Sequence, residues 1–189
     1  MVNYLASKKY VKDYRLEDRV NSKGKVRREA HYCGAYFTYQ NPEAAARLAR
    51  RLPIPVIGAT ACTLGTLLPA CGYMRAWYTT IPMVVLLPSL YMLWAGLCRM
   101  RAAEPPFTRE RRDRIADRIA GGGAMLLILS IIAALCGGAY LIFGGPQGWD
   151  YGCFAMDLFR VLFAALIFPM RKDAAMVELT REEPREEAT

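Results

Sequence analysis

Two charged side chains, Asp157 and Arg160, stand inside an otherwise uncharged apolar run that extends from Tyr151 to Met170. Because they are three residues apart, a helix would put them on the same face. An arginine near the centre of a bilayer costs about 2.5–3.5 kcal/mol on insertion scales, so Arg160 should face protein groups and have a partner. Asp157 is the nearest candidate, and we predict that the two form an intramembrane ion pair.

Three roles fit such a pair. An internal ion pair would lock the last helix to the rest of a bundle. Charges left unmatched within the chain would dock against a charged helix of another membrane protein, and charges around a wet cavity would belong to an ion or solute path. The sequence does not separate the first two roles, and it favours the path less.

The pair belongs to the last of four apolar runs, which polar segments separate. Hydrophobic residues make up 54% of the chain, and residues 52–74, 76–98 and 119–149 carry no charge. A helix needs about 20 apolar residues to cross the hydrocarbon core of a bilayer. We therefore predict an all-α membrane protein whose transmembrane domain, residues 52–172, contains four transmembrane helices. Their expected positions are about 53–74, 77–98, 121–144 and 151–170.

The net charge of +8 is distributed unevenly between these runs. Lys and Arg number 12 in residues 1–51, 7 in residues 99–118 and 4 in residues 171–189, whereas Arg75 lies alone between the first two runs. Four crossings would bring the three basic segments to one side, which the positive-inside rule makes cytoplasmic. We predict cytoplasmic N- and C-termini in a bacterial inner (plasma) membrane. The lipid bilayer is the expected partner of these charges, and nucleic acid is not.

Residues 1–51 carry strand, turn and helix signals. Apolar and charged residues alternate up to Val20, Gly24 fits a turn, and a return strand is expected from Lys25 to Tyr39. We predict a small cytoplasmic β-hairpin followed by a short juxtamembrane helix capped by Asn41. The segment contains no apolar h-region, so we expect no cleavable signal peptide.

Two charged segments follow at the same side of the membrane. Residues 99–120 are expected to form a cytoplasmic loop with a solvated helix capped by Thr108, and Gly121–Gly123 reads as a hinge before the third crossing. Residues 173–189 are acidic and are expected to form a disordered cytoplasmic tail.

Small residues at helical spacing predict faces on which helices approach closely in lipid. The candidate positions are Gly58, Ala61 and Gly65 in the first run, and the overlapping pairs Ala133 with Gly137 and Ala134 with Gly138 in the third.

Two features are expected at the external face. The aromatic residues of the short turn 73–78 fit an interfacial belt. Cys71 and Cys153 both fall near this face, and a disulfide between them would be within reach if the first and last helices touch there.

Enzyme signatures are missing from the sequence, which has no Cys-x-x-Cys, no phosphate-binding glycine loop followed by lysine and a single histidine. We therefore predict no catalytic, cofactor or metal site. The favoured function is a non-enzymatic subunit or adaptor of a membrane complex, bound to another membrane or cytoplasmic protein or forming a homo-oligomer. The alternative is a small transporter or channel component acting as an oligomer, and a membrane-embedded enzyme comes third.

Overall fold

The computed structural model describes residues 8–20, 26–67, 72–102 and 104–179, and most of them are helical. The helices are α1 (Pro42–Arg51), α2 (Pro53–Leu67), α3 (Gly72–Arg75), α4 (Trp77–Ala102), α5 (Arg109–Phe143) and α6 (Asp150–Met170). Short 3-10 turns, η1 (Lys8–Asp13) and η2 (Arg171–Ala174), accompany the strands β1 (Tyr14–Val20), β2 (Val26–Tyr32), β3 (Tyr36–Tyr39), β4 (Phe107–Thr108) and β5 (Met176–Glu178).

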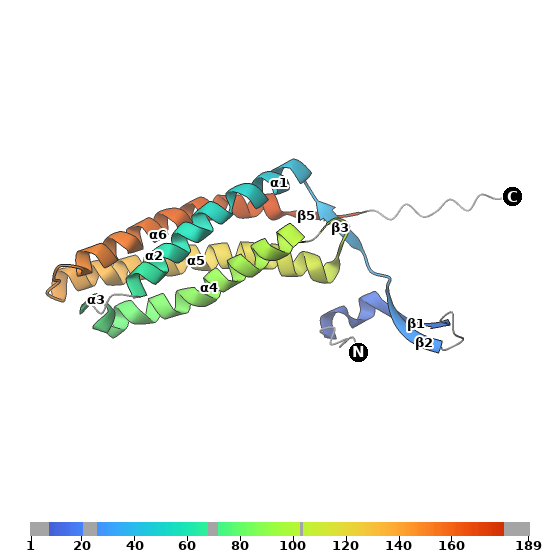
Figure 1. Cartoon of the computed structure of the whole chain (residues 1–189), viewed down its shortest axis with the longest axis horizontal. Coiled ribbons are helices and arrows are strands. Elements are labelled where there is room, and N and C mark those ends of the chain that lie inside the picture. Colours follow the sequence, from blue (N-terminus) through green and yellow to red (C-terminus); the bar gives the residue numbers. More distant parts are fainter. Residues whose placement is uncertain (1–7, 21–25, 68–71, 103, 180–189) are drawn as a thin grey trace.

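The long helices form one elongated bundle (Figure 1). α4 packs along α5, and α6 packs along both α2 and α5. α4, α5 and the segment from Asp150 to Ala174 are each long and apolar enough to cross a membrane. The first predicted crossing, about 53–74, corresponds to the 15-residue helix α2, to residues 68–71, which are outside the described part, and to α3.

α1 begins as predicted. The Asn41 side chain accepts a hydrogen bond of 3.1 Å from the backbone N–H of Ala44, and Pro42 occupies the first turn. α1 ends at Arg51, and Pro53 starts α2 after a single intervening residue, so the two helices follow each other closely (Figure 1).

The outer surface of the bundle differs from that of a water-soluble helical protein. Polar side chains are buried, among them Thr63, Thr66, Ser89 and Ser130, and large apolar side chains are exposed on the outer helix surfaces. Lipid does not drive apolar side chains inward, whereas water does. The exposed apolar surface includes Ile57, Leu64, Val84, Ile128, Leu135, Ile142, Leu158 and Leu162. This distribution fits a bundle surrounded by lipid.

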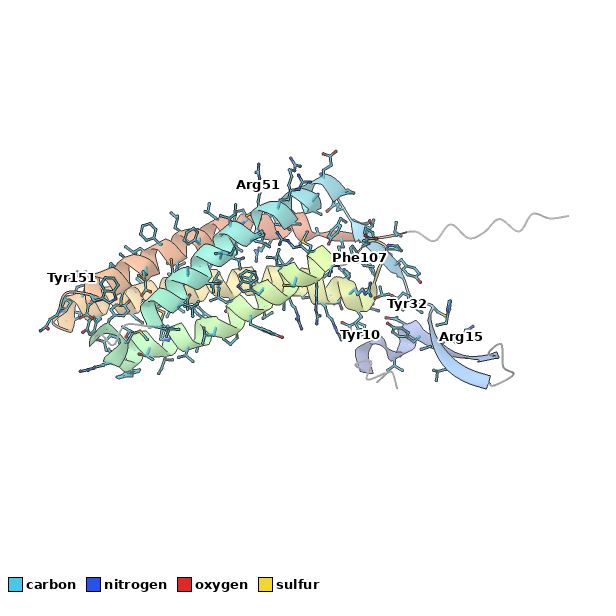
Figure 2. The ribbon with its side chains drawn as sticks, viewed as in Figure 1. Tyr10, Arg15, Tyr32, Arg51, Phe107 and Tyr151 are labelled. Atoms are coloured by element: carbon cyan, nitrogen blue, oxygen red, sulfur yellow. The ribbon has the colours of Figure 1, made fainter. Side chains whose placement is uncertain are left out.

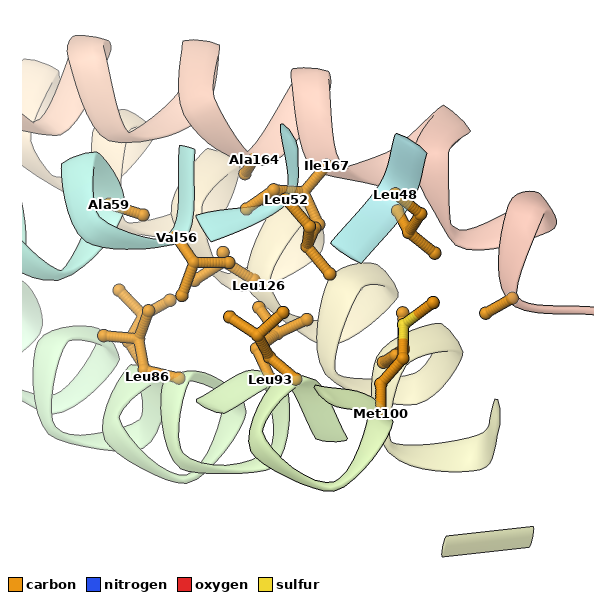
Figure 3. Close-up of a cluster of buried hydrophobic side chains, with 14 of the residues drawn as sticks. Leu48, Leu52, Val56, Ala59, Leu86, Leu93, Met100, Leu126, Ala164 and Ile167 are labelled. Carbon is orange, nitrogen blue, oxygen red and sulfur yellow. The ribbon is translucent and has the colours of Figure 1, made fainter. Parts of the chain in front are cut away.

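An apolar core fills the half of the bundle nearer α1. Side chains from α2, α4, α5 and α6 meet there, including Val56, Leu93, Leu126 and Ile167 (Figure 3). Each is fully buried.

The N-terminal strands form a separate two-stranded sheet. β1 pairs with β2 in antiparallel register from Tyr14 opposite Tyr32 to Val20 opposite Val26, and Gly24 lies outside the described residues. The expected return strand does not continue to Tyr39, because β2 ends at Tyr32. A Cβ atom on Gly34 would lie 2.7 Å from the Tyr32 hydroxyl, so glycine permits the close approach at this break.

β3 belongs instead to a second sheet, built from three distant segments in the order β4-β3-β5. Phe37 pairs with Phe107 on one side and with Glu178 on the other. The rings of Tyr39 and Phe107 meet edge to face with centroids 5.1 Å apart. The expected disordered tail therefore begins with η2 and β5, and residues 180–189 lie outside the described part.

α5 confirms one expectation and corrects another. Residues 109–120 form the expected helix capped by Thr108, and this helix continues without a break into the crossing as one 35-residue helix. Gly121–Gly123 is not a hinge: a Cβ on Gly122 would lie 3.0 Å from Leu93 Cγ and 3.2 Å from Leu93 N. Gly122 lets α4 approach α5 closely, whereas Gly123 faces Ile167 of α6. Ile115 and Ile119 of α5 are buried as well.

Gly122→Ala should destabilise the bundle, because the new methyl group meets the backbone of α4. Gly121→Ala is the matched control, since its Cβ would meet only the end of the Met92 side chain at 3.6 Å. Both changes gain the same helix propensity, so the difference between them should be an overpacking cost of about 1–3 kcal/mol. Thermal unfolding in detergent measures it. Equal midpoints for the two variants would contradict tight packing at Gly122.

Candidate functional site

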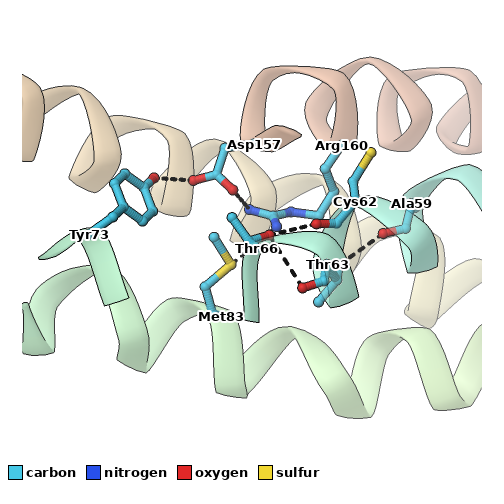
Figure 4. A network of polar contacts seen from close by, with 8 residues as sticks. All are labelled: Ala59, Cys62, Thr63, Thr66, Tyr73, Met83, Asp157 and Arg160. Carbon is cyan, nitrogen blue, oxygen red and sulfur yellow. Dashed lines mark hydrogen bonds and ion pairs between the residues drawn. The ribbon is translucent and has the colours of Figure 1, made fainter. Parts of the chain in front are cut away.

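Asp157 and Arg160 lie together inside the bundle, where neither side chain has any exposed surface. Arg160 Nη2 donates to Asp157 Oδ1 at 2.8 Å, as expected for residues one helical turn apart (Figure 4). The pair that the sequence predicts therefore faces the chain's own helices.

Tyr73 completes the carboxylate's contacts from the other side. Its hydroxyl donates to Asp157 Oδ2, so each Asp157 oxygen accepts a hydrogen bond (Figure 4). The Tyr73 hydroxyl occupies the space that a Cβ on Gly137 would take. Gly137 was predicted as a small residue for helix packing, and here it makes room for a tyrosine. Tyr73 itself is fully buried, which corrects its assignment to an interfacial aromatic belt.

The guanidinium of Arg160 has fewer partners than donors. Nη1 contacts Met83 Sδ on α4 at 3.1 Å, and thioether sulfur is a weak acceptor. Nε is buried without a hydrogen-bond partner among the described residues. Nearby on α2, the Thr63 and Thr66 hydroxyls donate to the carbonyls of Ala59 and Cys62, back along their own helix (Figure 4). Asp157 is therefore the main compensation for the charge of Arg160.

A second carboxylate fixes the backbone of the same tyrosine. Asp150 Oδ1 accepts from Tyr73 N at 2.9 Å, and Oδ2 accepts from Gln147 N at 2.9 Å and from the Tyr140 hydroxyl at 3.3 Å. Asp150 is 3% exposed. Together the two aspartates hold α3 against α5 and α6.

Sequence reasoning missed Tyr73 and Asp150 as members of this site. The position of Asp150 at the start of the last apolar run was a usable signal, because carboxylates favour helix N-termini. Tyr73 offered no such signal.

The small residues of the first run have different surroundings. A Cβ on Gly58 would meet the Phe163 ring and one on Gly65 would meet Met156, so both glycines lie against α6. Ala61 is exposed.

The two small-residue pairs of the third run face different ways. Ala133 and Gly137 are buried in the bundle. Ala134 and Gly138 instead line a shallow apolar groove between α5 and α6, together with residues that include Phe154.

The disulfide prediction remains a prediction. Cys71 lies outside the described residues, and Cys153 is buried near the start of α6.

The arrangement is suited to holding helices together. Acid–base or nucleophilic chemistry would require a substrate to reach Asp157, whose side chain is sealed from solvent. Within the described ranges, no three His, Cys, Asp or Glu side chains gather as a metal site requires. What the site does is compensate the buried charge of Arg160 with that of Asp157, away from water.

No protein-family model matches this sequence, and neither the curated proteins nor the solved structures contain a match.

Arg160→Leu should lower stability strongly, because it leaves Asp157 buried with only Tyr73 as a partner. Removing one member of a buried ion pair typically costs about 3–5 kcal/mol. Replacing both Asp157 and Arg160 with Leu should cost less than either single change. Unfolding of all three variants in detergent gives a double-mutant cycle, with Arg75→Leu as a control for loss of an exposed arginine. Additive effects would refute direct coupling.

Tyr73→Phe should cost about 1.5–3 kcal/mol, since the lost hydroxyl donates to a buried charged group. The matched control is Tyr78→Phe, because Tyr78 is half-buried and its ring contacts Trp77. The two midpoints should differ in thermal unfolding. If Tyr73→Phe and Tyr78→Phe unfold at the same temperature, the Tyr73 hydroxyl does not support the Asp157–Arg160 pair.

Proposed function

We propose that this chain is a multi-pass membrane protein that serves as a non-enzymatic subunit or adaptor, presenting its N-terminal hairpin to a cytoplasmic protein. The proposal rests on a contrast between the buried charges of the bundle and the projecting hairpin. The intramembrane charges are compensated within the chain and have no exposed surface, whereas the hairpin projects away from the bundle (Figure 1). The bundle therefore acts as an anchor, and the hairpin is the recognition element.

Four crossings are proposed, of which the segment from α2 to α3 is the first. The pairing of β3 with β4 supports this count, because paired strands must lie on the same side of the membrane. α4 is one crossing between these strands, so the chain must cross once more between Tyr39 and Trp77. The pairing of β3 with β5 is consistent with two further crossings, α5 and α6.

The arginine-rich end of the bundle is proposed to be cytoplasmic. The ends of α1 and α4, the start of α5 and η2 carry basic residues, and the small β4-β3-β5 sheet joins these segments at one end. Arg75 lies at the opposite end, in α3. By the positive-inside rule this asymmetry supports cytoplasmic termini, in a bacterial inner membrane.

The hairpin is attached to the bundle at a defined point. The Tyr10 hydroxyl donates to Asp113 Oδ2 at 2.9 Å, and the Tyr32 hydroxyl accepts from Arg109 N at 2.9 Å (Figure 2). Tyr32 also donates to the Ala35 carbonyl, and burial raises the pKa of Tyr32, which keeps this donor protonated. These contacts hold the hairpin beside the start of α5.

The composition of the hairpin supports a protein partner. Leu16 on β1 is 71% exposed and Val11 on η1 is 56% exposed. A two-stranded sheet is only marginally stable alone, and its outer edges can accept a further strand. An added strand from a cytoplasmic protein would pair with an open edge of this sheet and cover the exposed apolar side chains.

A transport path through the charged pair is less well supported, because neither Asp157 nor Arg160 meets solvent. A path would need these groups in a wet cavity.

The proposal is tested by isolating the tagged full-length chain in nanodiscs from the cell that makes it, with mass spectrometry of co-purifying proteins. A stoichiometric cytoplasmic or membrane partner is expected. Leu16→Ser should reduce its recovery by about fivefold or more, as for loss of an apolar contact of about 1 kcal/mol, without changing the unfolding midpoint.

The matched control is Val177→Ser, an exposed apolar residue on β5, outside the hairpin. This variant should retain the partner. A clean homo-oligomer with nothing attached would contradict the adaptor function and favour an oligomeric transporter.

A further inference from the structure

A cleft separates the end of α4 from the start of α5. It encloses about 320 Å³ and is lined by Arg99, Ala102, Arg111, Arg114 and Ile115. The two helices are in close contact deeper in the bundle, where a Cβ on Gly96 would lie 2.9 Å from Ile119 Cγ1. Three of the five lining side chains are guanidinium groups, so the cleft is strongly positive.

Of the arginines around this cleft, only Arg114 has an acidic partner among the described residues. Arg114 forms an ion pair with Glu110, but Arg99, Arg111 and Arg118 form no salt bridge with any described residue. Arg118 is not one of the lining residues; it lies one helical turn further along α5 than Arg114, beside Gly96. Of the other carboxylates on this part of α5, Asp113 accepts from Tyr10 and lies 3.7 Å from Arg112, and Asp117 is exposed.

Two guanidinium nitrogens are buried without compensation. Arg99 Nη1 and Arg118 Nη1 are inaccessible to solvent, and within the described part of the chain neither has a hydrogen-bond partner. A buried donor on a cation is costly to leave unpaired. Since the two residues come from α4 and α5, one anion between the helices would satisfy both.

Phosphate is the anion that suits this geometry. Guanidinium groups bind phosphate oxygens through paired N–H donors, and a phosphate has enough oxygens to engage two or three arginines together. A carboxylate, with two oxygens, would leave part of the cluster unpaired.

The position of the cleft favours a lipid as the source of the phosphate. It lies at the end of α4, a helix able to cross the membrane, and its lining includes the apolar residues Ala102 and Ile115. Further along the two helices, exposed Tyr91 and Met125 belong to the apolar outer surface. Basic pockets between transmembrane helices at the membrane surface bind anionic headgroups.

We propose that the cleft between α4 and α5 binds the phosphate of an anionic phospholipid headgroup, held by Arg99, Arg111, Arg114 and Arg118. The acyl chains would lie along the apolar surfaces of the same helices. This site is independent of the adaptor role, because it needs neither the hairpin nor a protein partner.

The test uses the purified full-length chain in a neutral detergent, titrated with phosphatidylglycerol or with phosphatidylcholine, and counts retained lipids by native mass spectrometry. Phosphatidylglycerol should bind preferentially. Arg99→Gln combined with Arg118→Gln should weaken its binding by about 25-fold, the product of about fivefold for each arginine.

Arg50→Gln is the matched control, because Arg50 is an exposed arginine of α1 at the same end of the bundle. It should bind phosphatidylglycerol like the unmodified chain. If Arg50→Gln weakens binding as much as the double change, the effect is general surface charge and the specific site is refuted.

Two further measurements separate guanidinium binding from simple charge, and lipid from soluble phosphate. Arg99→Lys with Arg118→Lys preserves charge but not the paired donors, so it should bind with intermediate affinity; this pair carries the test if the glutamine variants do not fold. Unchanged affinity in the lysine pair would refute the guanidinium site. Millimolar inorganic phosphate should not displace the lipid, and displacement would identify soluble phosphate as the ligand instead.

Discussion

The structure depends on compensating one guanidinium in a medium that offers no water. Arg160 is fully buried, and its charge is opposed by the carboxylate of Asp157 one turn earlier on the same helix. An isolated arginine at this depth would be expelled or would draw water into the bilayer. Because Asp157 also accepts from Tyr73, and Arg160 also contacts Met83, the pair connects α6 with α3 and α4. Three segments thus share the cost of one buried charge.

This dependence explains features that look unrelated in the sequence. Gly137 must lack a side chain because the Tyr73 hydroxyl takes its place. Asp150 accepts from the Tyr73 backbone, so the ring of Tyr73 enters the bundle at a fixed angle. The small residue, the tyrosine and the second aspartate all serve the position of one carboxylate. The charges at the other end of the bundle behave differently, since several arginines gather there with few acidic partners.

Part of the fold and of the Asp157–Arg160 site could be predicted from the sequence, because these parts depend on residues that are close together in the chain. The spacing of Asp157 and Arg160 determines that they share a helix face, and the capping of α1 by Asn41 depends on neighbours in the chain. The apolar runs identify a membrane protein because the bilayer sets a minimum length.

The features that were missed depend on distant partners. Gly121–Gly123 reads as a hinge until Leu93 of α4 is known to press on Gly122. β3 reads as a continuation of the hairpin, because nothing near Tyr36–Tyr39 reveals that Phe107 and Met176–Glu178 will pair with it. The burial of Tyr73 likewise depends on Gly137, which lies far along the chain.

The three-stranded sheet also sets an order of events during biosynthesis. β3 leaves the ribosome early, but β5 follows α6, so their pairing waits until every helix between them has been synthesised. Until then the strand edge of β3 has unpaired backbone groups, which quality-control proteases and chaperones recognise in incomplete chains. The β4-β3-β5 sheet can thus close only after all the long helices have been synthesised, at the end of the bundle where the hairpin emerges (Figure 1).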